Sequence, residues 1–121
     1  METKKRTEII TKWIDDYCQS MAFSPKALVV GISGGIDSSV VSTLCALTGR
    51  KTIILSMPIK QAKLQHDLSL KHGGWLSSKY NNVEFNLIEL EKIFNSFKET
   101  LSKFNNEHGL ANSRARLRMT A

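Results

Sequence analysis

The stretch from Gly31 to Ser39 constrains the fold more than any other part of the sequence. It reads Gly-Ile-Ser-Gly-Gly-Ile-Asp-Ser-Ser and follows a short, uncharged, mainly apolar run over 27–32. Such a run is typical of a strand buried on both faces. From Ile36 onward apolar residues recur at helical spacing, and Gly49 stands where the C-terminus of a helix favours glycine. The pattern predicts a strand, a glycine loop and a helix in succession.

The loop between this strand and this helix suits an anionic ligand. Gly34 and Gly35 allow the backbone to turn sharply and to approach a ligand without a Cβ in the way. Backbone N–H groups at the start of the helix point toward such an anion, and the helix dipole favours it. Ser33 and Ser38 add hydroxyl donors. We therefore predict that the loop binds phosphate groups.

Asp37 places a carboxylate beside this predicted phosphate site. The two negative charges repel unless a cation lies between them, so Asp37 is predicted to hold Mg²⁺. The loop differs from a Walker A loop, because no Lys-Ser or Lys-Thr pair follows the glycines at the required place. It also lacks the third glycine of the dinucleotide-binding fingerprint. A serine- and glycine-rich turn with an incidental Asp is the alternative, and the flanking strand and helix argue against it.

Two further strand–helix units follow this first one. Strand patterns cover 51–56 and 83–88, and helix patterns cover 61–80 and 89–104. Successive units of this kind predict an α/β fold, with a Rossmann-like parallel sheet of about three strands flanked by helices. Ligands bind beyond the carboxyl ends of such strands, so Ser56-Met57-Pro58 is expected beside the phosphate loop, as a candidate adenosine site.

Several expectations concern individual helices. Gly73-Gly74 should kink or break the helix over 61–80, because interior glycines weaken helices. His66 and His72 have no carboxylate or Cys partner at ligand spacing, and are expected at the surface or at helix ends. A first helix is predicted over 5–21. Apolar stripes on these two helices are predicted to face the core, and their residues are Ile9, Ile10, Trp13, Ile14, Tyr17 and Met21, then Leu64, Leu68, Trp75, Leu76 and Tyr80.

Composition is consistent with one small domain over residues 1–121. The chain has 41% hydrophobic and 23% charged residues, as ordinary globular domains do, and its net charge of +6 favours a polyanionic ligand such as a nucleotide. Cys18 and Cys45 lack metal-ligand spacing and are expected to be free, buried thiols. No leader or membrane-length apolar run is present, so we expect a cytoplasmic protein that binds no membrane.

The segment from Gly109 to Ala121 carries three arginines and no acidic residue. On a helix Arg114 and Arg118 share a face, and Arg116 points almost opposite. One interpretation is a solvated basic helix. The other is that Arg116 faces a phosphate or carboxylate of a substrate, which its planar guanidinium fits well.

Two motifs together resemble a known family. The SGGxDS loop from Ser33 to Ser38 is similar to the pyrophosphate loop of the N-type ATP pyrophosphatases, which have the adenine nucleotide alpha hydrolase-like fold. With Ala111-Asn-Ser-Arg-Ala-Arg-Leu-Arg-Met119, the sequence resembles the ammonia-dependent NAD synthetases, which carry N-x-x-A-R-x-R-M at a similar distance downstream. The resemblance covers nearly the whole chain and implies the N-terminal half of that family's domain.

The resemblance implies a ligase of NAD biosynthesis that forms a carbon–nitrogen bond. ATP would adenylate the nicotinate carboxylate of deamido-NAD, pyrophosphate would leave, and ammonia would displace AMP. The nitrilase-like glutaminase domain of some members is absent, which makes ammonia the nitrogen donor. The resemblance also implies a homodimer, Mg²⁺ at Asp37, and a contact from Arg116 to deamido-NAD. The implied ATP contacts are Gly31, Ile32, Ser33, Gly34, Gly35, Ile36, Asp37 and Ser38.

Two alternatives stay open at this point. The first is another SGGxDS pyrophosphatase, such as a GMP synthetase or a tRNA-modifying enzyme. The chain has no CxxC pair, and no aromatic residues interleave its basic segment, which argues against binding to RNA. The second is a nucleotide-binding module without catalysis, because family members run to about twice this length. ATP binding without pyrophosphate release would support the second alternative.

Overall fold

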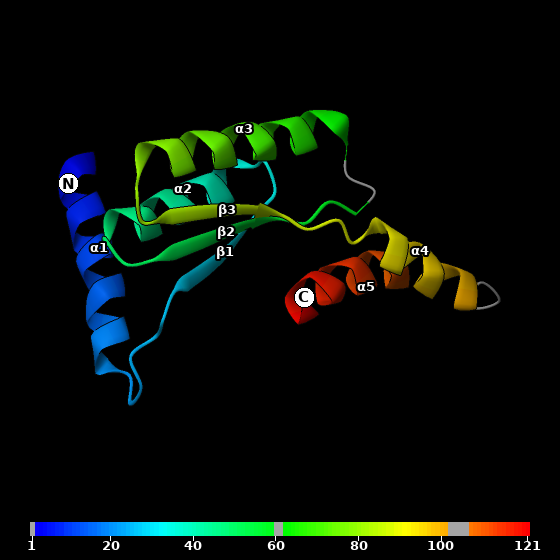
Figure 1. The fold of residues 1–121 in the computed structure, drawn as a ribbon, viewed down its shortest axis with the longest axis horizontal. Coiled ribbons are helices and arrows are strands. Elements are labelled where there is room, and N and C mark those ends of the chain that lie inside the picture. The colour runs from blue at the N-terminus through cyan, green and yellow to red at the C-terminus, as the bar shows by residue number, and fades with distance from the viewer. Residues whose placement is uncertain (1, 60–61, 102–106) are drawn as a thin grey trace.

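Three parallel strands form the sheet on which two of the helices pack (Figure 1). The computed structural model describes residues 2–59, 62–101 and 107–121. The strand order is β1-β2-β3, and the register pairs Ile32 with Ser56 and Ile54 with Phe85. In chain order the elements are α1 (Thr3–Ser20), β1 (Leu28–Ile32), α2 (Ile36–Leu47), β2 (Thr52–Ser56), α3 (Lys63–Lys79), β3 (Val83–Leu87), α4 (Glu91–Thr100) and α5 (Glu107–Thr120). The predicted α/β class with a three-stranded parallel sheet is confirmed.

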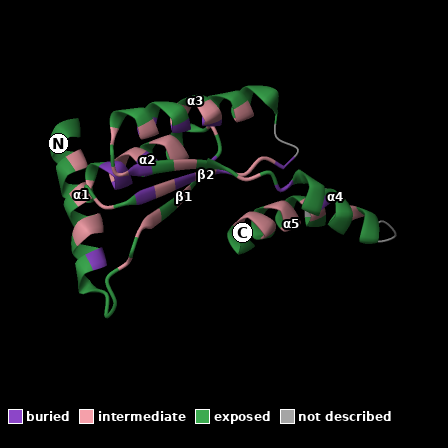
Figure 2. Ribbon diagram, in the orientation of Figure 1, coloured by how far each residue is buried: buried purple, intermediate pink, exposed green. Residues whose placement is uncertain are grey.

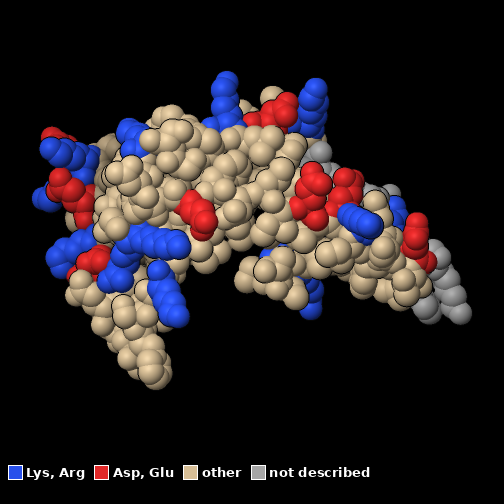
Figure 3. All heavy atoms as spheres, in the orientation of Figure 1, with Lys and Arg blue, Asp and Glu red and all other residues tan. Residues whose placement is uncertain are grey.

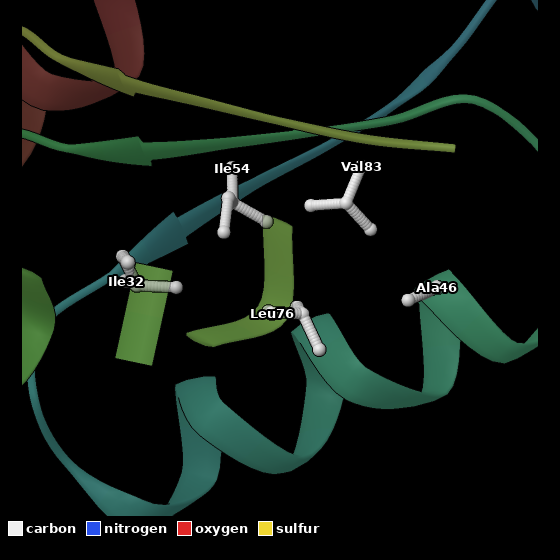
Figure 4. Packing of buried hydrophobic residues seen from close by; sticks show 5 residues of the cluster. All are labelled: Ile32, Ala46, Ile54, Leu76 and Val83. Carbon is white, nitrogen blue, oxygen red and sulfur yellow. The ribbon is translucent and has the colours of Figure 1, made fainter. Parts of the chain in front are cut away.

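The main core lies between the sheet and the helices α2 and α3. Apolar side chains from all three strands meet side chains from both helices there, and Figure 4 shows them turned toward one another: Ile32, Ala46, Ile54, Leu76 and Val83. Ile54 and Leu76 are fully buried. This packing fixes the position of α2, and therefore of the loop that precedes it.

The opposite face of the sheet is open in this chain. Burial alternates along β1, and Val29 is 62% exposed. The prediction that β1 is buried on both faces is therefore wrong here, because α2 and α3 both pack on the other face. β2 is the more buried strand, since it pairs with a neighbour on each side.

α3 runs without interruption through Gly73 and Gly74. Of the predicted kink or break, the break is wrong, because these glycines do not end the helix: Gly73 lets it lie close to the sheet. A Cβ added at Gly73 would come within 2.6 Å of the Phe85 ring. The buried residues of α3 are accordingly Ser69, Gly73 and Leu76. The predicted apolar stripe is mostly wrong, since its members Leu64, Leu68 and Trp75 are exposed.

α1 lies at the end of the molecule away from α4 and α5, and most of its surface is exposed (Figure 2). Trp13 and Tyr17 are 64% and 57% exposed, with their rings stacked 5.5 Å apart. Cys18 is the buried residue of this helix. The prediction that both aromatic rings belong to the core is wrong for this chain, because the less exposed residues Thr7, Thr11 and Cys18 lie on another side of α1.

α4 and α5 lie beyond the carboxyl ends of the strands and share a second, smaller core (Figure 1). Ile59, Leu90 and Phe94 are buried there, and Leu110 and Leu117 of α5 pack against them. α4 is shorter than the predicted helix over 89–104, and Phe104 lies outside the described residues.

Two further expectations can be compared with the structure. Cys18 and Cys45 are free and buried, as predicted, and burial, together with the nearby Cys18, raises the pKa of the Cys45 thiol. Among the described residues, no helix has both the length and the apolar character needed to cross a membrane.

Candidate functional site

The glycine loop lies at the carboxyl end of β1 and leads directly into α2. Gly34 has φ of +91°, and a Cβ at this position would overlap the backbone carbonyl of Gln65 in α3. Glycine is therefore required at this position for two reasons: the backbone conformation and the lack of space for a side chain. Gly35 has an ordinary φ of −83°, so it does not need positive φ. Of the two glycines in the loop, Gly34 has a positive φ, and the close approach of a phosphate to Gly35 stays a prediction.

Serine side chains hold this loop in shape. The Ser33 N–H donates to Ser38 Oγ at 3.1 Å, and the Gly35 N–H donates to Ser33 Oγ at 3.2 Å. Ser39 Oγ donates to the Gly35 carbonyl at 2.9 Å. These hydroxyls order the loop before any ligand arrives, which lowers the entropy that binding must offset.

The start of α2 has no side-chain cap and carries a carboxylate in its first turn. Gly35 is the N-cap and has no side chain to cap the helix, so the first N–H groups of α2 point outward. Asp37 lies in the first turn and is exposed. No group of three or more potential metal-ligating side chains occurs among the described residues. Asp37 by itself could supply one carboxylate to a Mg²⁺ ion whose other ligands are phosphate and water oxygens.

A cavity of about 690 Å³ opens beside the loop, between the sheet and α5. Residues 31–33 form one wall, Met57 and Gln65 form others, and α5 contributes Arg114 and Arg118. The charged side chains among its described lining residues are these two arginines. Burial and the charge of Arg114 both lower the pKa of Arg118, and a bound anion would relieve this crowding of positive charge. Figure 3 shows the notch between the sheet and α5.

The loop after β2 reaches this cavity, as expected for neighbouring parallel strands. Met57 places its Cε 3.4 Å from where a Cβ of Gly31 would lie. The Met57 carbonyl accepts a hydrogen bond from Arg118 Nε at 2.9 Å. The structure therefore brings together the glycine loop, the loop after β2 and α5, which carries Arg114 and Arg118.

Arg116 lies apart from these residues. It lines a separate groove of about 280 Å³ between α4 and α5, with apolar neighbours such as Ile93 and Phe97. The predicted opposition between Arg116 and the other two arginines is confirmed, but Arg114 and Arg118 are the ones that face the loop. The contact from Arg116 to deamido-NAD stays a prediction.

Residues 6–121 match the family model described as NAD synthase. The chain belongs to the NAD synthase family. Among curated relatives, the NH(3)-dependent NAD(+) synthetase of Finegoldia magna is 33% identical over 120 residues, which cover 98% of this chain and 47% of the relative. That of Pyrobaculum aerophilum is 32% identical over 124 residues, covering 99% and 44%. The chain thus spans about half the length of the curated relatives it matches.

Solved structures of NAD synthase relatives share the fold of this chain. The NMN synthetase of Francisella tularensis superposes with a TM-score of 0.84 at 27% identity, covering 99% of this chain and 48% of the other. The NH3-dependent NAD synthetase of Campylobacter jejuni, solved with the nitrate ion, gives 0.82 at 30% identity, with 99% and 50% covered. The chain therefore folds as half of an NAD synthase does.

Two residues near the site were not found from the sequence. Gln65 lines the cavity and packs its carbonyl against Gly34, and α3 brings it there. His72, expected at the surface, places Nε2 2.8 Å from Oγ of the fully buried Ser42, which in turn donates to the Ser39 carbonyl. Burial lowers the pKa of His72. Both residues depend on how α3 packs against α2, which no local pattern indicates.

Proposed function

We propose that this chain is the ATP-binding domain of an ammonia-dependent NAD synthetase. In the proposed reaction ATP adenylates the nicotinate carboxylate of deamido-NAD, pyrophosphate leaves, and ammonia displaces AMP to form NAD. One observation carries the proposal: the loop from Ser33 to Ser38 lies at the uncapped start of α2, beside a cavity whose described charged groups are arginines. Family membership over 6–121 supports it.

This geometry suits the chemistry of adenylation. The carboxylate and the α-phosphate repel each other as they approach, so the site must supply positive potential. The N–H groups of the loop and of α2 supply part of it, and Arg114 and Arg118 supply more. Mg²⁺ at Asp37 would neutralise further phosphate charge. The reaction needs no side-chain nucleophile, because the substrate carboxylate attacks.

Binding of Mg-ATP to this chain tests the proposal. By titration calorimetry, we expect Mg-ATP to bind more tightly than ATP in EDTA. Asp37→Asn should remove most of this Mg²⁺ dependence while leaving the fold intact, since Asp37 is exposed. Asp16→Asn, which loses only an exposed ion pair on α1, is the matched control. Equal Mg²⁺ dependence in wild type and Asp37→Asn would contradict the metal assignment.

The arginines require the whole reaction to be measured. The test uses a longer polypeptide that also contains the part of the relatives' sequence that this chain does not span. In it, Arg116→Lys should raise the KM for deamido-NAD about tenfold and leave the KM for ATP unchanged. Lysine keeps the charge but loses the planar fork. Arg114→Lys is the control on the other helix face. Equal effects of the two variants on the KM for deamido-NAD would refute the assignment to Arg116.

The synthesis of NMN is a second candidate function, because the solved NMN synthetase superposes on this chain with a TM-score of 0.84. Pyrophosphate release by the longer polypeptide, measured with each substrate in turn, decides between NAD synthesis and NMN synthesis. Pyrophosphate release that depends on deamido-NAD supports NAD synthesis, and release that depends on the shorter nicotinate mononucleotide supports NMN synthesis. ATP binding without release in either case supports a nucleotide-binding module. The cytoplasmic location and the homodimer also stay predictions.

A further inference from the structure

Met57 is the residue at which the walls of the cavity meet. Its methyl group lies against Gly31 at the end of β1. Its side chain packs against the second core, which contains Ile59, Leu90 and Phe94. Its carbonyl accepts the hydrogen bond from Arg118. Any movement of Met57 therefore changes the cavity on the side facing the phosphate loop.

Arg118 makes this contact from a distant part of the chain. The two residues are 61 positions apart, and Nε of Arg118 lies 2.9 Å from the Met57 carbonyl oxygen. Met57 and Arg118 are both partly buried, so water competes weakly for the Met57 carbonyl. Arg114, one turn earlier, lines the same cavity, and its guanidinium lies over the Phe94 ring. The two arginines share one cavity but have different attachments.

We propose that Arg118 is a positioning residue of the nucleotide pocket: its Nε–H holds the Met57 carbonyl and so fixes the wall that the loop after β2 contributes. The ligand class is an adenine nucleotide, and in this respect the inference rests on the proposed function. The role differs from charge recognition, because the Nε–H bond needs a donor at one point in the side chain and needs no positive charge.

Two substitutions at Arg118 separate the donor from the charge. In Arg118→Gln, Nε2 is bonded to Cδ, as Nε is in arginine, so a neutral donor stays near the Met57 carbonyl. Arg118→Met has similar length and no donor. Arg114→Gln removes one charge from the same cavity and keeps Arg118, the donor to the Met57 carbonyl, so it is the matched control. Should Arg118→Met fail to fold, Arg118→Ala also removes the donor without adding bulk.

Affinity for Mg-ATP is measured by calorimetry on this chain. We expect Arg118→Met to bind about tenfold more weakly than Arg118→Gln, the value of one hydrogen bond to a partly buried carbonyl. Arg118→Gln should match Arg114→Gln. Equal weakening in the Gln and Met variants at Arg118 would overturn the proposal and leave charge as the whole effect.

Hydrogen exchange in the ligand-free chain separates this inference from the proposed function. Exchange at the amides of Met57 and Ile59 should speed up in Arg118→Met and stay at the wild-type rate in Arg118→Gln. Unchanged exchange in Arg118→Met would overturn the positioning role, whatever the chain binds. A further outcome is that the wild-type chain fails to bind Mg-ATP while Arg118→Met still exchanges faster than wild type. That result would uphold the positioning of the loop and refute the nucleotide site.

Discussion

At the scale of single residues, the shape of the loop depends on Gly34, and Gly49, outside the loop, is a comparison for it. Gly34 and Gly49 both have positive φ, at +91° and +78°. They differ in their surroundings, because a Cβ at Gly34 would overlap the Gln65 carbonyl, and a Cβ at Gly49 would meet nothing within 4 Å. The two positions therefore separate backbone strain from steric exclusion.

Gly49→Ala should lower the free energy of unfolding by about 1–2 kcal/mol, the cost of a left-handed backbone for an L-residue. Gly34→Ala should lose this amount and about 1–3 kcal/mol more, because α3 must move away from the loop. Urea denaturation measures both, and Mg-ATP affinity should fall only in Gly34→Ala. Equal destabilisation of the two variants would show that Gln65 moves freely.

The residues of the loop could be predicted from sequence because their chemistry is local. Ser33, Gly34 and Asp37 are close in the chain, and the flanking strand and helix fix their arrangement. The choice among the arginines could not be predicted in this way. Periodicity places Arg114 and Arg118 on one face of α5, but the docking of α5 on the second core decides which face meets the loop.

At the scale of elements, α3 shows how packing overrides propensity. Two interior glycines weaken an isolated helix, yet α3 continues through them, since Gly73 contacts Phe85. Periodicity therefore predicted the existence of α3 correctly, while the identity of its buried face depended on the sheet. The same holds for α1, whose aromatic stripe has no cover in this chain.

The adjacent glycines of α3 give a matched pair of substitutions. Gly74→Ala should stabilise the chain by about 0.8–1.0 kcal/mol, because nothing lies within 4 Å of the added Cβ and alanine favours a helix. Gly73→Ala should destabilise it by about 1–3 kcal/mol, because the Cβ would press on the Phe85 ring. The two urea midpoints should move in opposite directions, and stabilisation at both sites would contradict the close packing.

The contact between α2 and α3 should make stability depend on pH. Burial lowers the pKa of His72 below its ordinary value of 6.5, so the unfolded chain binds this proton more readily. Stability from His72 is complete above about pH 6.5 and falls as the pH drops toward the lower folded pKa. His72→Gln should flatten this part of a thermal midpoint-against-pH curve. Lys71→Gln, at an exposed neighbour, should leave the curve unchanged.

At the scale of the whole molecule, apolar surface is left uncovered in two places. One is the sheet face that bears Val29, and the other is the stripe of α1 around Trp13 and Tyr17. On the face that Figure 3 shows, charged side chains lie at the two ends and along the upper edge of the molecule, and few lie over its middle. Exposed apolar patches are typical of surfaces that contact other protein, a membrane or a ligand.

We predict that α1 forms part of a homodimer contact. Sedimentation at micromolar concentration should show a dimer, and Trp13→Lys should shift it toward monomer, because a buried ammonium at the contact is costly. Leu64→Lys is the control, at an equally exposed apolar residue on α3. A monomeric wild-type chain, or equal effects of the two variants, would contradict a contact through α1.

The division of the interior into two separate cores has a consequence for how the chain unfolds. One core joins the sheet to α2 and α3, and the other joins α4 to α5. Because the two clusters have no buried residue in common, we expect the α4–α5 part to open while the sheet stays intact. The cavity lies at the boundary between them, with Arg118 bridging to Met57. A ligand that spans this boundary would join two melting transitions into one.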